Sequence, residues 1–363
     1  MSFMQDFRKK VAKMKSVVTE FTPPKYWTSV GNFAVNKIVS GSFVRGIPQG
    51  RVTCLAGPSG SGKTFLLCNL LKNAQNDGSI VLVLDSENAL DEDYLRKVGV
   101  DQDPEKFMYA GVDTFGSVVE VLSEFIKSYV TTYGPTGDKG PKVIMALDSV
   151  DMLLTDTEES NFDKGVQKGD QGQRAKQQKH MLRTIVQKIK RLPISFVITH
   201  QVFPNAEITN GQGAWIINNG LRYSCSQIFL VNSLNLKDDA EIVGVRMVVE
   251  TYKSRFAKKG SRVTIEVPYD TGINKYSGFV DMMVELGVVR AAGAWKYIIP
   301  YEGQEELKFQ SKFSDKLFDA CMNNPKIRDI EQDIITRMDV EVENVELDED
   351  EEIDQETGEI LVK

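Results

Sequence analysis

The chain is poor in the residues that build metal and disulfide sites. Its 363 residues include two histidines and four cysteines. The cysteines lie far apart with no CxxC pair, so we expect reduced packing thiols in a cytosolic protein, without a histidine-based metal site: Cys54, Cys68, Cys225 and Cys321. No run approaches the 18 apolar residues of a transmembrane helix, and the N-terminus lacks the continuous apolar stretch of a secretory signal.

Negative charge is concentrated at the C-terminal end. The formal net charge is −7, but residues 339–363 hold twelve acids and one base, or −11, which leaves +4 for residues 1–338. A mildly basic body leaves room for a polyanionic partner. We expect the acidic tail to be disordered. It could screen a polyanion-binding channel, recruit basic proteins or keep the chain soluble, and the sequence leaves these roles open.

The apolar pattern predicts an α/β fold. Apolar positions three and four apart in residues 2–20 indicate a short helix that must dock on its own body or on a neighbour. Seven runs rich in β-branched residues predict strands: 51–56, 80–85, 143–148, 194–199, 227–232, 245–251 and 262–267. Helix-length segments separate the early runs, including 65–73, 117–133 and 174–190. This alternation predicts a mostly parallel, twisted sheet flanked by helices, with an antiparallel edge where the last strands crowd together.

The stretch GPSGSGKT fits a phosphate-binding loop between a strand and a helix. Its glycines allow backbone N–H groups to face phosphates at a helix N-terminus. Lys63 supplies a compact positive charge, and Thr64 supplies a hydroxyl for Mg²⁺. Asp148 ends a later strand and is the second predicted magnesium ligand. We expect nine consecutive residues to contact the nucleotide: Gly57, Pro58, Ser59, Gly60, Ser61, Gly62, Lys63, Thr64 and Phe65.

Glu87 lies just beyond the strand that ends at Asp85. A carboxylate near the terminal phosphate can polarise an attacking water. In the alternative interpretation, both residues are ordinary first-turn acids of the following helix. The residues alone leave these two interpretations open.

Several co-linear segments resemble the RecA family of recombinases over roughly residues 40–330. They are LDSENALDEDYLRKVGVD, ALDSV, ISFVITHQ, TYKSRFAKKGSRVTIEV and YDTGINKYSGFVDMMVELGVV followed by GAW, and the later ones look closest to the phage UvsX branch. The resemblance implies that Glu87 is the general base, Asp91 holds the adenine amino group and Tyr94 stacks on adenine. It also implies a second adenine contact at Tyr269 and a γ-phosphate sensor at His200, with Gln201 as the alternative sensor.

The resemblance further assigns Lys253 and Arg255 to a basic pair that reaches the γ-phosphate of the neighbouring protomer. The alternative is a pair of surface bases at a strand end.

Two glycine-rich segments, 155–179 and 202–222, are predicted to be DNA-binding loops. The first supplies cations, and the second carries Phe203, Trp215, Ile216 and Ile217, which have no obvious core to join. The predicted DNA contacts are Lys164, Lys168, Arg174, Lys176, Phe203, Trp215, Asn219, Gly220 and Arg222. The alternative is two mobile surface loops with an ordinary packed tryptophan.

Together these features predict a RecA-type P-loop ATPase core at 31–270. An N-terminal helix and linker precede it at 1–30, and a small α+β C-terminal domain (271–338) and the acidic tail (339–363) follow. The predicted function is a DNA-dependent ATPase with ATP and Mg²⁺ that forms helical filaments on single-stranded DNA and catalyses strand exchange. The predicted partners are single- and double-stranded DNA, further copies of the chain, a single-strand-binding protein and a loading mediator, in the cytoplasm of a cell or phage-infected host. The alternatives are a hexameric helicase, which shares this core, and an ATP-binding mediator without strand-exchange activity.

Overall fold

The computed structural model describes residues 2–14, 23–166, 172–204, 215–339, 352–353 and 360–361. Residues 24–328 form one compact unit, and residues 1–23 and 329–363 are assigned to another. In the smaller unit, α1 (Phe3–Ala12) has no buried residue, and β16 (Glu352–Ile353) pairs antiparallel with β17 (Ile360–Leu361). Helix α11 (Pro325–Asp339) crosses the division. The predicted domain boundaries stay predictions.

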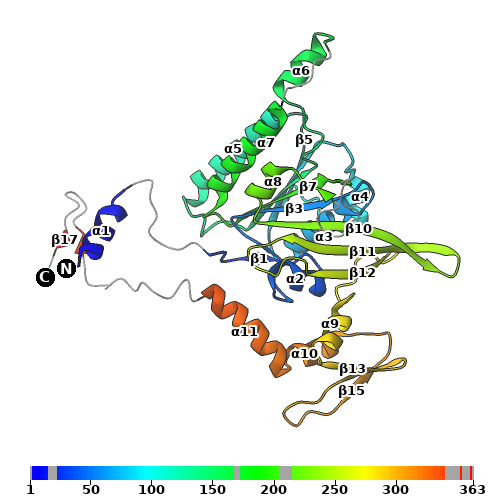
Figure 1. The fold of residues 1–363 in the computed structure, drawn as a ribbon. Helices are drawn as coiled ribbons and strands as arrows, with labels where there is room; N and C mark the ends of the chain where they lie inside the picture. The colour runs from blue at the N-terminus through cyan, green and yellow to red at the C-terminus, as the bar shows by residue number, and fades with distance from the viewer. Residues whose placement is uncertain are drawn as a thin grey trace. The chain divides into compact units, whose positions relative to one another are not determined.

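The larger unit is built on an eight-stranded sheet in the order β12-β11-β10-β3-β7-β6-β4-β5 (Figure 1). Its strands are β3 (Val52–Gly57), β4 (Ile80–Asp85), β5 (Phe107–Gly111), β6 (Val143–Asp148), β7 (Ile194–Gln201), β10 (Gln227–Asp238), β11 (Glu241–Lys253) and β12 (Arg262–Pro268). The six strands from β10 to β5 in this order run parallel. Strand β11 pairs antiparallel with β10, and β12 pairs antiparallel with β11. This confirms the predicted parallel sheet with an antiparallel edge.

Helices cover both faces of this sheet, which explains why its central strands are apolar throughout. One hydrophobic cluster packs the sheet against α5 (Phe115–Tyr133), α7 (Gln173–Ile189) and α8 (Asn219–Ser224). The other packs it against α2 (Phe33–Ser40), α3 (Lys63–Asn76) and α4 (Glu92–Val98). Alternate residues of β3 serve the two clusters, with Cys54 in the first and Leu55 in the second.

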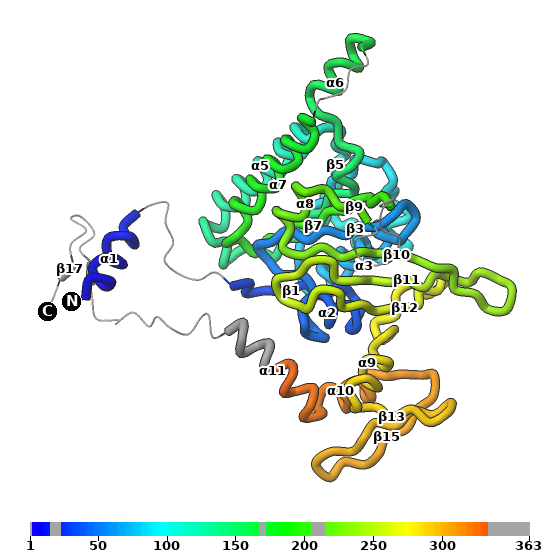
Figure 2. The backbone as a smooth tube through the Cα atoms, in the orientation of Figure 1, coloured from blue at the N-terminus to red at the C-terminus, as the bar shows by residue number. Residues whose placement is uncertain are grey.

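The antiparallel edge contains a long hairpin. Strands β10 and β11 pair from Ile228 with Lys253 to Asp238 with Glu241, and the hairpin projects past the rest of the sheet (Figure 2). Four short strands form two further pairs: β1 (Trp27–Thr28) with β2 (Ile47–Pro48), and β8 (Phe203–Pro204) with β9 (Trp215–Ile216).

The C-terminal part of the larger unit is a small α+β region, as predicted. Strands β13 (Val289–Ala292), β14 (Trp295–Ile298) and β15 (Leu307–Phe309) form an antiparallel sheet beside α9 (Phe279–Glu285) and α10 (Asp315–Met322). Aromatic rings connect it to α2, since Phe279 lies 5.2 Å from Phe43 and 5.1 Å from Phe318, and Phe33 lies 4.1 Å from Phe318.

The structure corrects two sequence predictions. The segment 155–179 is not a continuous loop, because α6 (Asp156–Asp163) begins one residue after its capping residue Thr155 and α7 begins at Gln173. Ile217 is 5% exposed and belongs to the core cluster around α5 and α7, and Trp215 packs against that cluster.

In the part of the chain that the structure describes, no helix is long and apolar enough to span a bilayer.

Candidate functional site

The candidate site lies where four neighbouring parallel strands end. Strands β3, β7, β6 and β4 are adjacent in the sheet and share a direction. The register pairs Ala56 with His200 and Asp85 with Asp148. Polar residues that lie far apart in the sequence therefore meet at one edge, where open α/β sheets bind ligands.

The predicted phosphate loop connects β3 to α3, and its backbone requires glycine at two positions. Gly62 caps α3 with φ +89°, a left-handed conformation that side chains disfavour. A Cβ on Gly57 would lie 2.2 Å from the carbonyl oxygen of Val231 on β10. The loop thus presents its N–H groups at the N-terminus of a 14-residue helix, a geometry suited to phosphate.

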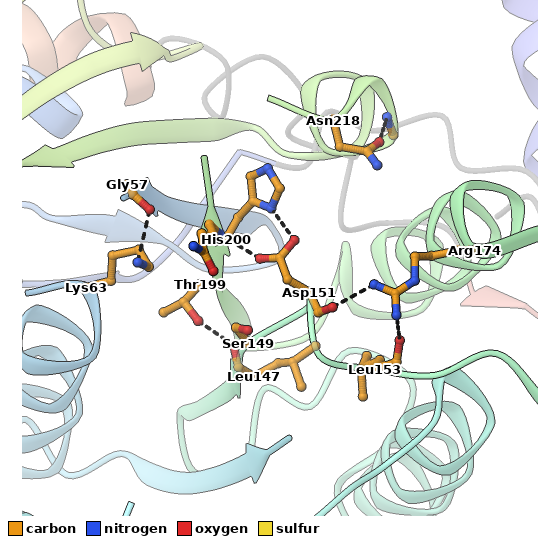
Figure 3. Close-up of polar contacts among 12 residues, drawn as sticks. Gly57, Lys63, Leu147, Ser149, Asp151, Leu153, Arg174, Thr199, His200 and Asn218 are labelled. Atoms are coloured by element: carbon orange, nitrogen blue, oxygen red, sulfur yellow. Dashed lines mark hydrogen bonds and ion pairs between the residues drawn. The ribbon is translucent and has the colours of Figure 1, made fainter. Parts of the chain in front are cut away.

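The Lys63 ammonium folds back over this loop. Its Nζ donates to the carbonyl oxygens of Gly57 at 3.0 Å and Pro58 at 2.9 Å (Figure 3). Burial lowers the pKa of Lys63, while the charges of Asp148, Glu87 and Asp151 raise it. Ser61 Oγ in the same loop is buried and has no hydrogen-bond partner among the described residues.

Asp148 is a buried carboxylate held by two hydroxyls. Thr64 Oγ1 donates to its Oδ2 at 2.7 Å, and Thr199 Oγ1 donates to its Oδ1. Burial raises the pKa of Asp148, the two hydroxyl groups lower it, and the charges of Glu87 and Asp85 raise it further. The two predicted magnesium ligands, Thr64 and Asp148, are therefore in direct contact.

Glu87 extends from the end of β4 and is exposed. The Ser149 hydroxyl donates to its Oε1 at 2.5 Å, and Ser149 N in turn donates to Ser86 Oγ at 3.0 Å. Helix α4 begins at Glu92 with Asp91 as its cap. The interpretation of Asp85 and Glu87 as first-turn acids is therefore wrong.

Asp85 and Asp91 have local structural contacts. Asp85 is buried and accepts from the N–H groups of Glu87 at 2.9 Å and Leu90 at 3.0 Å, so it shapes the turn that carries the glutamate. Asp91 accepts from Tyr94 N at 2.6 Å and thereby caps α4.

A cavity of about 520 Å³ adjoins the phosphate loop. Gly60 and Gly62 line it, as do three predicted nucleotide contacts, Phe65, Tyr94 and Tyr269. Apolar residues of β11 and β12 and several polar residues, including Lys72, Lys97 and Asp270, complete the lining. Burial raises the pKa of Tyr94, so its hydroxyl remains neutral. An aromatic, largely apolar cavity beside a phosphate loop suits a purine base. Asp91 does not line it.

Comparison with known proteins agrees with this geometry. The RecA N-terminal domain family matches residues 26–274. The chain belongs to the RecA family. It is 28% identical over 307 residues to Protein RecA of Desulforapulum autotrophicum, which covers 82% of this chain and 79% of that protein. Protein RecA of Nocardioides is 29% identical over 269 residues, which is 72% of this chain and 69% of the relative.

RecA-family proteins are DNA-dependent ATPases, and this chain is such an ATPase. The family generally uses ATP with Mg²⁺. Its residues fit that ligand. The unpartnered Ser61 Oγ, the ammonium of Lys63 and the position of the loop at the N-terminus of α3 suit phosphate oxygens. Among the described residues there is no group of three or more His, Cys, Asp or Glu side chains that could hold a metal. Mg²⁺ beside Thr64 and Asp148 would therefore also need phosphate oxygens and water.

The predicted sensor, His200, forms a contact that the sequence analysis missed. Its Nδ1 lies 2.8 Å from Asp151 Oδ1, and the N–H of Gln201 donates to Asp151 Oδ2 at 2.6 Å (Figure 3). His200 is 5% exposed, and its Nε2 has no partner among the described residues. The side chain of Gln201 is half-buried. Asp151 lies three residues after Asp148 and outside the sequence motifs, so no pattern in the sequence connected it to His200.

Lys253 and Arg255 lie away from the phosphate loop. Lys253 pairs with Ile228 near the start of β10, level with Cys54 of β3, whereas the phosphate loop follows Gly57 at the end of β3. Its Nζ donates to the carbonyl oxygens of Arg222 at 2.5 Å and Cys225 at 2.7 Å, at the C-terminus of α8. Burial lowers the pKa of Lys253, and the Cys225 thiol opposes this. Arg255 is exposed.

The predicted DNA contacts of the first segment have different surroundings. Lys168 lies outside the described residues. Lys164 and Lys176 are exposed, and Lys164 donates to Ser160 Oγ at 2.8 Å. Arg174 is half-buried, and its guanidinium donates to the carbonyl oxygens of Asp151 at 2.7 Å and Leu153 at 2.8 Å.

Four predicted DNA contacts of the second segment are exposed or half-buried. Phe203 is 60% exposed and Trp215 is half-buried. Asn219 and Arg222 are exposed on α8, and the Arg222 guanidinium lies 5.9 Å from the ring of Tyr252. Gly220 is buried, and its N–H donates to Asn218 Oδ1 at 2.7 Å. Trp215 therefore fits the alternative interpretation of an ordinary packed tryptophan, whereas the Phe203 ring is exposed to solvent.

Proposed function

We propose that this protein is a strand-exchange recombinase. It polymerises on single-stranded DNA as a helical filament and catalyses homologous pairing and strand exchange in recombination, repair and recombination-dependent replication. The observation that carries the proposal is the convergence of Lys63, Asp148, Glu87 and His200 at the ends of four adjacent strands. When bound, ATP supplies the anhydride bond that is cleaved, and Mg²⁺ neutralises charge on its phosphates.

Each side chain has one task in this proposal. Lys63 binds the outer phosphates, and Thr64 and Asp148 hold the metal. Glu87 accepts a proton from the attacking water, and the Ser149 hydroxyl keeps its carboxylate in place. His200 senses the terminal phosphate. Phe65, Tyr94 and Tyr269 surround the base in the adjoining cavity.

Lys253 and Arg255 complete the site of the neighbouring protomer. Their position supports this, because Lys253 lies at the start of β10 whereas the phosphate loop follows the far end of β3. Lys253 is level with Cys54, three residues before Gly57, and its ammonium is directed at the C-terminus of α8 instead of at the phosphate loop of its own chain. A head-to-tail arrangement brings them to the next chain and generates an open helix.

The DNA contacts are proposed for the segments that follow β6 and β7, with Phe203 as the apolar residue best placed to stack on a base. The proposed partners also include a single-strand-binding protein and a loading mediator. Within the RecA family we place the chain in the phage UvsX branch, acting in the cytoplasm of the infected host, on the residues quoted for that resemblance.

The decisive experiment combines turnover with imaging. Purified protein should hydrolyse ATP faster with single-stranded DNA, form joint molecules between homologous substrates, and appear as helical filaments in negative stain with an ATP analogue. Closed rings would support the helicase interpretation instead. Filaments without joint molecules would reject strand exchange.

A further inference from the structure

Asp151 connects several parts of the site although it is not in any of the motifs identified from the sequence. It lies three residues beyond Asp148, on the segment that follows β6. Its two carboxylate oxygens accept from neighbouring residues at the end of β7: Oδ1 is 2.8 Å from His200 Nδ1, and Oδ2 is 2.6 Å from Gln201 N. Its carbonyl oxygen accepts from Arg174 at 2.7 Å.

The chemistry of this pair fixes the imidazole. A carboxylate accepts and does not donate, so His200 Nδ1 carries the hydrogen in both the neutral and the charged ring. Nε2 is then the nitrogen left for a ligand. It is buried without a partner among the described residues, and Figure 3 shows it on the side of the ring away from Asp151. His200 also lies beside Ala56, the residue before the phosphate loop begins.

We propose that Asp151 is a positioning residue for His200: it holds the ring in one orientation and one tautomer so that Nε2 meets the nucleotide. This inference rests on the proposed function of His200. A glutamine at the same position would not need such a partner, because its amide supplies both a donor and an acceptor without tautomerism. The positioning role of Asp151 therefore applies only when residue 200 is histidine.

A purely structural role for Asp151 makes the opposite prediction. The carboxylate also accepts from Gln201 N, and this contact is independent of the side chain at position 200. If that contact were the whole role of Asp151, removing the carboxylate would lower kcat by the same factor with or without the histidine. A double-mutant cycle separates the two roles.

The kinetic test uses full-length wild-type protein, Asp151→Asn, His200→Gln and the double variant, with Asp151→Ala as a second substitution. Asp151→Asn preserves volume but can present an amide donor to Nδ1. We expect it to lower kcat for DNA-stimulated ATP hydrolysis about tenfold, with little change in KM for ATP. In the His200→Gln background the same substitution should change kcat less than about twofold. An equal loss in both backgrounds would overturn the proposal.

A second test does not depend on turnover. The chain has two histidines, so ¹⁵N-histidine spectra contain two imidazoles, and the exposed His180 is an internal control. In the wild type, His200 should show hydrogen on Nδ1, and in Asp151→Ala it should shift toward the Nε2–H form, whereas His180 should not change. An unchanged His200 tautomer would reject the positioning role even in protein that proved to lack DNA-dependent turnover, which would reject the proposed function separately.

Discussion

Glu87 is exposed at the end of β4, and its carboxylate is oriented by the Ser149 hydroxyl. We expect Glu87→Gln to lower ATP turnover by roughly 100-fold or more, because an amide cannot accept the proton of the attacking water. ATP binding, measured with a fluorescent analogue, should persist because Lys63 and the loop are unchanged. The matched control is Glu92→Gln in the first turn of α4, which should turn over ATP like wild type. Full turnover in the Glu87 variant would remove this residue from the mechanism.

The thiols illustrate how burial controls reactivity. All four cysteines are buried and free, and burial raises the pKa of both Cys68 and Cys321 to about 12. Native protein at pH 8 should therefore react with a thiol reagent far more slowly than unfolded protein, in which all four react. Rapid labelling of native Cys321 would contradict its packing in α10.

The same shift predicts how stability depends on pH. The unfolded Cys321 thiol ionises near pH 9, whereas the folded thiol stays protonated up to about pH 12. Its contribution to the free energy of unfolding is thus fully present below pH 9 and is lost as pH rises through 12, by about 1.4 kcal/mol per pH unit. Cys321→Ala should flatten denaturant-derived stability between pH 9 and 11 relative to wild type. Parallel curves for the two proteins would contradict this.

At the scale of elements, Lys253 connects strand β11 to helix α8. Its ammonium donates to two carbonyl oxygens at the C-terminus of that helix, which otherwise lack intrahelical donors. We expect Lys253→Ala to accelerate amide hydrogen exchange across residues 219–225 and to weaken binding of single-stranded DNA. The exposed Lys258→Ala on the same segment is the matched control. Unchanged exchange in α8 would show that the helix does not depend on this lysine.

Helix α9 depends on aromatic packing against α2. Phe279 is fully buried among the rings of Phe33, Phe43, Phe313 and Phe318. Phe279→Ala should lower the free energy of unfolding by about 3–5 kcal/mol, measured by urea denaturation. Phe203→Ala provides the control, because that ring is 60% exposed, and it should leave stability within about 0.5 kcal/mol. Equal stability losses would contradict the assigned burial.

The sequence predicted helices and strands well where their burial gave a clear apolar pattern. Strands such as β4 and β6 are apolar up to their last residue, an aspartate, because helices cover both faces of the sheet, and their bounds were predicted correctly. Strand β5 was missed because it lies at the sheet edge with partly exposed residues. Helix α6 was missed because it buries no residue and therefore has no apolar stripe.

The site was predictable where residues fall in a contiguous motif, as in the phosphate loop. The contact between Asp151 and His200 was not predictable, because the pairing of β6 with β7 brings these two segments together. Asp151 has no sequence feature that connects it to His200 before the two strands are known to be neighbours. Likewise, Ile217 looked stranded in a polar loop, but the return of the chain toward α8 buries it.

At the scale of the whole molecule, the proposed ATP site needs two chains. Glu87 lies at the carboxyl end of β4, whereas Lys253 lies near the start of β10, so one protomer supplies the base and its neighbour supplies the cations. Two inactive variants should then complement each other. Glu87→Gln keeps its cations, and Lys253→Ala/Arg255→Ala keeps its glutamate.

Mixing these two variants in equal amounts on single-stranded DNA creates junctions at which both intact halves meet. Random assembly makes such junctions about a quarter of the total, so turnover should recover to about a quarter of the wild-type rate. A Glu87→Gln/Lys253→Ala/Arg255→Ala chain mixed with Glu87→Gln protein provides the control, since no junction in that mixture contains an intact glutamate. Recovery only in the first mixture requires that catalytic groups come from different chains. If neither mixture recovers although each variant still forms filaments, the cations act within their own protomer and the shared site is excluded.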